Sequence, residues 1–335
     1  MTTKLSPKIG IIIPAYNIEK HIFRALESCI NQSYKNIEVV VVDDGSSDGT
    51  YDVVDRYRRM DSRIKLYRQE NSGVSVARNA AMKNCTTDYI LFLDSDDWLE
   101  LNTVERFVQN LDQSRSQRNL ISSGCYYVNM DDCGGIRKVI SDNETQAIFM
   151  TSNEALMYVG ERKYNLRSSC YKLFSMAVIR DNGLRFAEDI KHGEDGLFVF
   201  EYLKKADGFI YFPDPLWNIF RRSGSASRSP YTGTKMSAVT AVERMLACEN
   251  GKALSRKLRK FYVQRMLTIL GNAFLANKDA GNDILLLRKK LRKNFWSYMI
   301  LQKSFKLKLI YVLEAFGPKR LARFLLVKRK KSLAE

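Results

Sequence analysis

Short apolar runs that alternate with helical patterns in the front part of the chain constrain its fold more than any other feature. Four runs read as strands, three of them buried on both faces, as in a parallel sheet: Ile9–Ile13, Ile37–Val42, Ile64–Tyr67 and Tyr89–Leu93. Apolar residues at helical spacing predict helices over 19–31, 50–60 and 74–84. We expect the first strand to stop at Pro14, because proline cannot donate to a central ladder. This alternation predicts an α/β fold with right-handed crossovers.

Acidic residues follow two of the predicted strands. Asp43 and Asp44 come after the second run, and Asp94–Asp97, with three carboxylates, comes directly after Leu93. The carboxyl ends of strands in an open α/β sheet share the edge where such sheets bind ligands. Crowded carboxylates are unfavourable unless a cation offsets them, and an Asp-x-Asp pair of oxygen ligands suits Mg²⁺ or Mn²⁺. The residues therefore indicate a cation site at this edge.

A second interpretation treats both clusters as ordinary turns. Asp96 or Asp97 would then be the N-cap of a helix that begins near Trp98. Asp43 and Asp48 would cap a loop and the helix after it. The residues alone leave both interpretations open.

The C-terminal part of the chain is strongly basic. Residues 236–335 contain 23 of the 54 lysines and arginines but 6 of the 37 aspartates and glutamates, so they carry the whole net charge of +17. This asymmetry indicates an anionic contact surface: a membrane, a nucleic acid or an acidic polymer. Helical patterns run throughout it, and we expect domains at 1–233 and 234–335. In 318–331 basic residues interleave with Leu and Phe, which fits either an interfacial helix on anionic lipid or a solvated face.

Cysteine and histidine usage argues against a zinc site or a disulfide framework. The six cysteines form no C-x-x-C pair, and the only histidines are His21 and His192. We expect buried thiols in a reducing compartment. The start of the chain lacks a signal-peptide pattern, and no run reaches the ~20 apolar residues of a spanning helix. These features predict a cytoplasmic protein, with peripheral attachment to the inner face of the cell membrane as a possibility.

Several motifs in register, spread over residues 9 to about 230, resemble those of the family 2 glycosyltransferases. They are Ile12–Asn17, Gln32–Tyr34, Val42–Thr50, Asn71–Asn79, Tyr89–Trp98, Lys172–Phe174, Gly193–Asp195 and Arg222–Ser225. The resemblance implies a GT-A fold, with a Rossmann-like, mostly parallel sheet flanked by helices, followed here by the C-terminal α-helical region. It also implies inverting sugar transfer from a nucleotide sugar. Residues 236–335 show no comparable motif.

The resemblance implies a nucleotide site at the ends of the first two strands. Pro14 and Tyr16 would flank the base, and Asp44 would accept a hydrogen bond from the uracil ring N–H. Arg78 would approach the nucleotide or the diphosphate. A solvated position on its helix is the alternative for Arg78.

The resemblance also implies a metal site after Leu93. Asp96 would bind Mn²⁺ or Mg²⁺, and Asp94 would contact the ribose or the metal with its water, with Ser95 also in the donor site. A metal there would neutralise the charge that grows on the leaving nucleotide. Asp97 is expected to serve the following helix.

Two acidic residues are candidates for the chemistry itself. Inversion in one displacement needs a base that takes the proton of the acceptor hydroxyl. By family position Asp195 is that base, and Glu194 helps to bind the acceptor or to orient the loop. His192 is a weaker rival. The alternative is an acidic first turn of a helix, which the helix dipole favours.

The resemblance further implies that a loop with several serines and arginines, residues 220–228, completes the donor site. Arg222, favoured over Arg221, and Ser227 would close over the donor diphosphate. Lys172 matches a family position near the acceptor side, without a defined role.

The predicted function is metal-dependent transfer of a hexosyl or N-acetylhexosaminyl group from a UDP-sugar to a hydroxyl. The acceptor would be a glycan or a lipid-linked oligosaccharide in surface polysaccharide synthesis, near an anionic membrane. A protein or a teichoic-acid-like polymer is an alternative acceptor. A basic nucleic-acid-binding protein is the alternative of another class, but no nucleic-acid motif is visible and no nucleic-acid partner is expected.

Overall fold

A computed structural model describes most of the chain, which forms two compact units. The described residues are 6–114, 116–129, 136–140, 144–161, 163–221, 231–275 and 281–296, with single residues at 299, 308 and 312. One unit comprises Met1–Glu188 and Glu194–Ser223, and the other comprises Asp189–Gly193 and Gly224–Glu335. The domain boundary expected at residue 233 stays a prediction.

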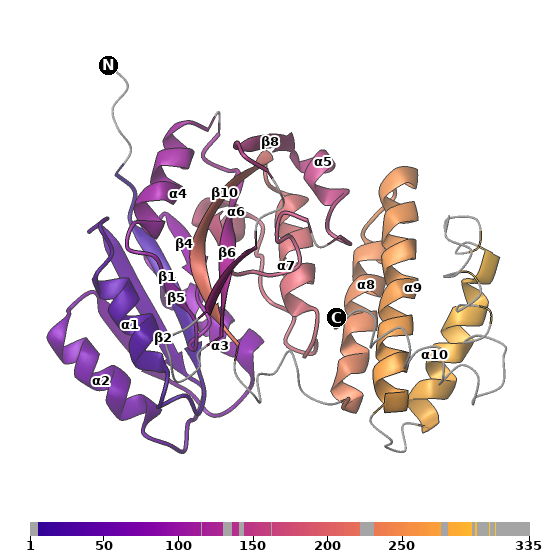
Figure 1. The fold of residues 1–335 in the computed structure, drawn as a ribbon, viewed down its shortest axis with the longest axis horizontal. Helices are drawn as coiled ribbons and strands as arrows, with labels where there is room; N and C mark the ends of the chain where they lie inside the picture. The colour runs from indigo at the N-terminus through magenta and orange to yellow at the C-terminus, as the bar shows by residue number, and fades with distance from the viewer. Residues whose placement is uncertain are drawn as a thin grey trace. The chain divides into compact units, whose positions relative to one another are not determined.

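The first unit opens with the predicted alternation of strands and helices (Figure 1). Its first elements are β1 Ile9–Ala15, α1 Ile22–Ile30, β2 Ile37–Asp43, α2 Thr50–Met60, β3 Ile64–Arg68, α3 Val74–Asn84 and β4 Tyr89–Phe92. Later elements are β5 Trp98–Leu99, α4 Thr103–Asp112, β6 Leu120–Asn129, β7 Ile136–Ile140, β8 Ile148–Thr151, α5 Ser152–Leu156, β9 Lys172–Ser175, α6 Met176–Asp181, α7 Glu194–Leu203 and β10 Gly208–Phe220.

The strands form one mixed sheet in the order β3-β2-β1-β4-β9-β6-β10-β5, with β7 beside β6 and β8 beside β10. The strands β3, β2, β1 and β4 are parallel neighbours, which confirms the predicted parallel sheet of the front part. Strand β9 is antiparallel to both β4 and β6. The carboxyl ends of β1, β2 and β4 therefore share one edge, as the acidic clusters require.

Strand β1 extends past its expected end. Pro14 pairs with Val42 of β2, and β1 continues to Ala15. The pairing with β4 stops at Ile12, whose carbonyl accepts from Leu93. Since residues two apart face the same neighbour, Pro14 faces the side where β4 has ended. Its missing N–H therefore costs no ladder hydrogen bond there.

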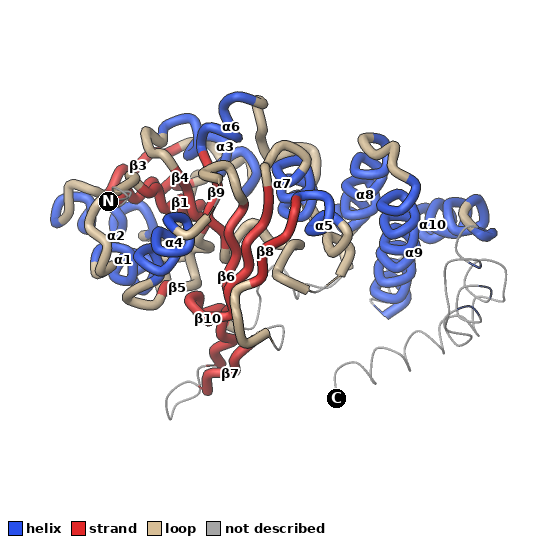
Figure 2. The backbone as a smooth tube through the Cα atoms, turned by 90° about the horizontal axis from the view of Figure 1, so that it is seen from above, coloured by secondary structure: helices blue, strands red, loops and turns tan. Residues whose placement is uncertain are grey.

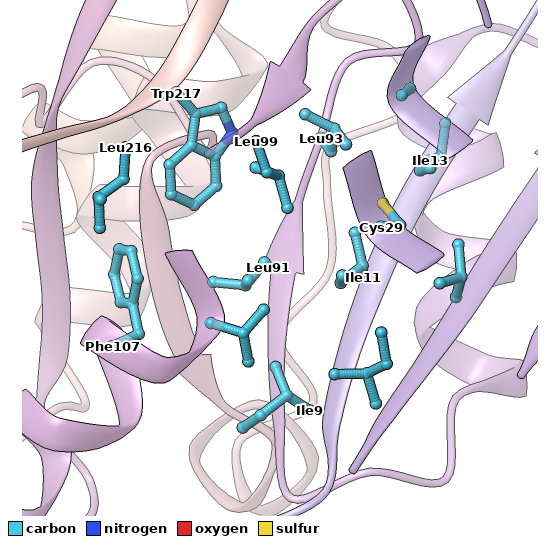
Figure 3. Close-up of a cluster of buried hydrophobic side chains, with 14 of the residues drawn as sticks. Ile9, Ile11, Ile13, Cys29, Leu91, Leu93, Leu99, Phe107, Leu216 and Trp217 are labelled. Atoms are coloured by element: carbon cyan, nitrogen blue, oxygen red, sulfur yellow. The ribbon is translucent and has the colours of Figure 1, made fainter. Parts of the chain in front are cut away.

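Alternate residues of the central strands pack into two cores on opposite faces of the sheet. On one face, Ile9, Ile11 and Ile13 of β1 join the buried sides of α1, α2 and α4. Figure 3 shows part of this cluster, where Phe107 and Leu216 lie near Trp217. On the other face, Phe92 contacts Phe174, Phe186 and Phe198 edge-on, beside α3 and α7. Helices on both faces bury the sheet and leave its edge for a site.

The second unit is helical in its described part, as predicted (Figure 2). It contains a 3₁₀ turn at Gly233–Met236 and the helices α8 Ser237–Ala247, α9 Lys252–Leu275 and α10 Gly281–Lys293. Val239, Met266 and Leu287 are among the residues of its separate apolar core. Among the described residues, none of the helices combines the length and the hydropathy that crossing a membrane requires. The segment 318–331, for which an interfacial helix and a solvated face were both open, lies outside the described residues.

Candidate active site

Arg78, Asp94 and Asp195 meet at the carboxyl edge of the sheet. Asp94 follows β4, and Asp195 lies in the first turn of α7. Arg78 Nη1 donates to Asp195 Oδ1 over 2.7 Å, and Arg78 Nη2 donates to Asp94 Oδ1 over 2.9 Å. Glu194 Oε1 lies 3.9 Å from Nη1. One guanidinium thus joins Asp94 to the adjacent Glu194 and Asp195, which come from a distant segment of the chain.

Helix α3 carries Arg78 inward because small residues share its buried face. Ala77 and Ala81 are fully buried and let the helix lie close to the sheet. The guanidinium carbon of Arg78 lies 5.2 Å from the ring centroid of Phe186 and 6.0 Å from that of Phe92. Only 4% of its side chain is exposed, so the alternative of a solvated helix residue is wrong.

Arg78 supplies part of the positive charge that the crowded carboxylates require. A buried charge is tolerated only when it is paired, and here one positive charge faces Asp94, Glu194 and Asp195. The neighbouring carboxylates raise the pKa of Arg78 against the effect of its burial. The cluster keeps an excess of negative charge, which leaves room for a further cation or for protonation.

The pKa of Glu194 reflects its burial and this excess of negative charge. Burial, and after it the neighbouring Asp195, raise the pKa of Glu194 to about 7 against the opposing effect of Arg78. Only 13% of its side chain is exposed, which agrees with burial as the main cause. Near neutral pH this carboxyl can therefore hold or release a proton.

Asp195 is held through one of its two oxygens. Besides Arg78, Ser169 Oγ donates to Asp195 Oδ1 over 2.8 Å, and Ser169 is fully buried. Ser169 was not among the predicted site residues, and no motif marks it. The structure gives Asp195 Oδ2 no hydrogen bond to the described residues.

Asp94, Ser95 and Asp96 are all partly exposed after β4. Arg78 occupies Oδ1 of Asp94, and 45% of that side chain is exposed. No group of three or more His, Cys, Asp or Glu side chains that could hold a metal occurs in the described parts of the chain. Two carboxylates suffice for Mg²⁺ or Mn²⁺ when phosphate and water complete the shell, so the donor set fits such an ion.

Asp97 does not serve a following helix. Trp98–Leu99 forms β5, which pairs with β10, and α4 begins only at Thr103 with Asn102 as its N-cap. Asp97 is buried, and its Oδ1 accepts from Phe220 N over 2.8 Å. The capping interpretation of Asp96 and Asp97 is therefore wrong. Their turn leads into a strand, and Asp97 fastens the end of β10 to it.

At the other end of the edge, Asp44 accepts hydrogen bonds from three neutral donors. Asp44 Oδ1 accepts from Gln69 Nε2 over 2.7 Å and from Ser72 N over 2.9 Å, and Oδ2 accepts from Gly73 N over 2.8 Å. Gly73 has φ +95°, a conformation that favours glycine. Asp44 is 4% exposed. A carboxylate has about four acceptor positions, so one remains for a ligand.

The loops around Asp44 are also fixed. Asp48 Oδ1 accepts from the N–H of Thr50, the first residue of α2, over 3.0 Å, although the N-cap of α2 is Gly49 and not the expected Asp48. Asn17 Oδ1 accepts from Ser47 N over 2.9 Å and joins the end of β1 to this loop. Pro14 is buried, whereas Tyr16 is half exposed beside the edge. Tyr16 is therefore available to a flat ligand.

The remaining predicted residues are placed differently. Arg222 and Ser227 lie outside the described residues. The guanidinium carbon of Arg221 lies 3.6 Å from the ring centroid of Tyr127. In the second unit, burial and then Lys235 and Arg265 lower the pKa of His192, and its Nε2 lies 3.4 Å from Thr234 Oγ1.

Comparisons with known proteins agree on a family. The family model described as glycosyl transferase family 2 matches residues 10–182. The glycosyltransferase GlyA of Streptococcus pneumoniae is 34% identical over 226 residues, which are 66% of this chain and 32% of GlyA. The putative glycosyltransferase EpsH of Bacillus subtilis is 30% identical over 215 residues, 64% of this chain and 60% of EpsH. The chain thus spans less than two thirds of each of these relatives.

A third relative is known both in sequence and in structure. The poly(ribitol-phosphate) β-N-acetylglucosaminyltransferase TarS of Staphylococcus aureus is 28% identical over 229 residues, 67% of this chain and 37% of TarS. A crystal structure of TarS 1–349 in complex with UDP-GlcNAc superposes with a TM-score of 0.73 and 21% identity, and covers 97% of this chain and 92% of that one. This likeness confirms the predicted GT-A fold with C-terminal helices.

Proposed function

We propose, from the premise that the chain belongs to glycosyl transferase family 2, that it transfers N-acetylhexosamine from a UDP-sugar to a hydroxyl group of a surface polymer. One observation carries the proposal. At the ligand-binding edge of the sheet, Asp195 is fixed through Oδ1 by Arg78 and Ser169, beside the partly exposed Asp94. A carboxylate with one oxygen fixed and the other unengaged suits a base next to a leaving diphosphate.

The nucleotide end supports uridine as the base. The remaining acceptor position of Asp44 would take the uracil imide N–H, and the half-exposed ring of Tyr16 would stack on the base. Pro14 would close the other side from β1. The TarS complex contains UDP-GlcNAc, which favours this donor for the first trials.

Asp94 and Asp96 would hold Mn²⁺ or Mg²⁺ together with the donor phosphates, and Ser95 would lie against the donor between them. When bound, the ion neutralises charge that develops on the leaving diphosphate. Arg222 and Ser227 would contribute further donors to the diphosphate.

The chain's own acids would move the proton. As the acceptor oxygen bonds to the anomeric carbon, its proton passes to Asp195 Oδ2 and the bond from that carbon to the diphosphate oxygen breaks. Attack opposite the leaving group inverts the anomeric centre. Arg78 orients Asp195 through Oδ1, and Glu194 would accept or donate a hydrogen bond to the acceptor.

A polyol-phosphate polymer is a second candidate acceptor, and one observation favours it. TarS, which covers nearly the whole chain in structure, is named for transfer to poly(ribitol phosphate). The excess of basic residues over 236–335 fits an anionic chain of this kind. The same charge would also hold the enzyme near anionic lipid, where a lipid-linked glycan acceptor resides.

Calorimetric titration of UDP, with GDP and dTDP as comparators, tests the donor site. We expect UDP to bind in Mn²⁺, to bind much more weakly in EDTA, and to lose its metal dependence in Asp96→Ala. Asp55→Ala is the matched control, since Asp55 pairs only with Arg58 and Arg59 on the surface of α2 in the described structure. A folded protein that binds none of the three nucleotides, yet binds DNA in a salt-dependent way, would overturn the proposal.

The base is tested by release of UDP from UDP-GlcNAc in the presence of candidate acceptors. Asp195→Asn keeps the shape of the side chain but cannot accept the proton. We expect turnover to fall by roughly 10²- to 10⁴-fold with UDP affinity nearly unchanged. Equal turnover in Asp195→Asn and wild type would exclude Asp195 as the base.

A further inference from the structure

Lys172 is a buried charged residue that the proposed reaction does not use. Its side chain is fully buried at the start of β9. Nζ donates to the carbonyl oxygens of Asn165 and Ser168 over 2.7 Å each, and to that of Cys170 over 3.3 Å. An ammonium group has three donors, and all three point into the preceding loop. The loop, residues 164–171, therefore closes around this one lysine.

The loop needs such support because its backbone is strained. Tyr164, Asn165 and Tyr171 have φ of +56°, +56° and +65°, although none of them is glycine. Left-handed backbone is strained for residues that carry a side chain. Strain persists only where surrounding contacts determine the conformation, and Lys172 supplies three of them inside the loop.

The loop presents Ser169 to the site. Ser169 is fully buried, and its Oγ donates to Asp195 Oδ1. The next residue, Cys170, forms an isolated bridge with Phe92 at the end of β4. Lys172 is thus linked to Asp195 through two consecutive steps: ammonium to loop carbonyls, and loop hydroxyl to carboxylate.

We propose that Lys172 and Ser169 are positioning residues for the base, with Lys172 shaping the loop so that the Ser169 hydroxyl holds Asp195 Oδ1 and turns Oδ2 toward the acceptor. The inference rests on the proposed role of Asp195. It assigns Lys172 a role inside the protein, in place of the acceptor-side position that its motif implies. Burial lowers the pKa of Lys172 to about 7, which is consistent with an amine that is closed off from solvent and bound substrate.

Three variants separate the two steps. Ser169→Ala removes only the hydroxyl, and Lys172→Met removes the ammonium but keeps a long apolar stem. Ser123→Ala is the matched control, because Ser123 is equally buried and its Oγ donates to Gly124 O, away from Asp195. For turnover with UDP-GlcNAc, we expect Ser169→Ala and Lys172→Met to lower kcat by roughly ten- to a hundredfold. We expect KM for the donor and the affinity for UDP with Mn²⁺ to stay within about twofold, and the double variant to be no slower than Lys172→Met.

Labelling with N-ethylmaleimide, read by mass spectrometry, follows the loop without any activity. Cys170 in the loop and Cys29 in α1 are both fully buried. We expect Lys172→Met to label at Cys170 while Cys29 stays protected, and Ser169→Ala to leave both protected. Protection of Cys170 in Lys172→Met would overturn the role of Lys172. If Cys29 also reacts, Lys172→Met has lost its fold. The kcat of Ser169→Ala, compared with that of Ser123→Ala, then tests the proposal.

The outcomes of the two proposals stay distinct. A Ser169→Ala variant as fast as Ser123→Ala would overturn the positioning role while wild-type turnover still supports the proposed function. No turnover in wild type would contradict the UDP-GlcNAc donor, and the labelling pattern would then decide whether Lys172 maintains the loop.

Discussion

The two ends of the ligand-binding edge treat their carboxylates in opposite ways. At the end that we propose for the nucleotide (the nucleotide end), Asp44 accepts from three neutral donors, two of them backbone N–H groups of residues 72 and 73. At the end that we propose for catalysis (the catalytic end), Asp94, Glu194 and Asp195 all pair with one cation, Arg78. Neutral groups thus hold Asp44, whereas in the described structure the carboxylates of the catalytic end outnumber the cation that they pair with. A surface that only binds a ligand can satisfy its carboxylates with fixed neutral donors. A site that transfers a proton needs groups whose pKa values lie near the working pH, and crowded charges produce such pKa values.

Among the substitutions that test this contrast, we expect Arg78→Met to have the largest effect on stability. Arg78→Met leaves three crowded carboxylates without their cation, and removal of one partner from a buried ion pair costs roughly 3–5 kcal/mol. We expect a loss of that order in the free energy of unfolding at pH 8, measured in urea. At pH 5.5 the loss should be smaller, because Glu194, whose pKa is raised to about 7, is then protonated.

The control for Arg78→Met is Arg58→Met. Arg58 pairs with Asp55 on the surface, where such pairs contribute little. A loss for Arg78→Met that is as small as that of the control, or independent of pH, would show that the catalytic end does not depend on this cation.

The nucleotide end should respond differently. Asp44→Ala leaves the Ser72 and Gly73 N–H groups without their acceptor, at a cost of about 1–3 kcal/mol. We expect a loss of stability of that size together with loss of UDP binding in calorimetry. Since the partners are neutral, the loss should be the same at pH 5.5 and pH 8. A clear pH dependence here would remove the contrast between the two ends.

We expect the smallest change in stability from a substitution of Glu194, which tests whether crowded charge at the catalytic end destabilises the protein. Its folded pKa, about 7, lies above the usual 4.5, so between these values the folded protein binds more protons than the unfolded chain. This contribution to stability is present below pH 4.5 and is lost as pH rises through 7. Glu194→Gln carries no such charge, so we expect it to be more stable than wild type at pH 8 by on the order of 1–2 kcal/mol.

Melting temperatures across pH 5 to 8 measure the effect of Glu194→Gln. The difference from wild type should grow with pH. The exposed Glu70→Gln is the control, and its melting curve should run parallel to that of wild type. A Glu194→Gln curve that is also parallel to wild type would mean that Glu194 ionises normally.

Local patterns predicted the front of the fold well. Helices α2 and α3 have the predicted bounds, and β4 lies where the apolar run placed it. Buried parallel strands and amphipathic helices can be predicted in this way because each produces a hydrophobic pattern within a short window of sequence. Strand β9 had no such pattern. It is four residues long and exists because β4 and β6 pair with it from both sides. Long-range pairing of this kind leaves little trace in a short window of sequence.

The residues of the candidate site were likewise predicted only in part. The motifs placed Asp44, Asp94 and Asp195 at one edge, and their roles as ligand, metal site and base stay predictions. The pairings of Asp195 and Asp97 were missed, because their partners come from distant segments: Arg78 lies 117 residues from Asp195, and Phe220 lies 123 residues from Asp97. Ser169 was missed because its loop uses left-handed residues other than glycine, so no turn signal marks it.

The 117 residues between Arg78 and Asp195 also set an order of events during synthesis. At about 5–20 residues per second, a ribosome adds them in roughly 6 to 23 seconds. Through that interval Asp44 and its three partners have already been made, and Arg78 gains Asp94 after a further 16 residues but neither Glu194 nor Asp195. The nascent chain therefore contains only one of the three carboxylates that pair with Arg78 until residue 194 is added, and premature termination before that residue yields a chain with Asp44 and its partners but without Asp195.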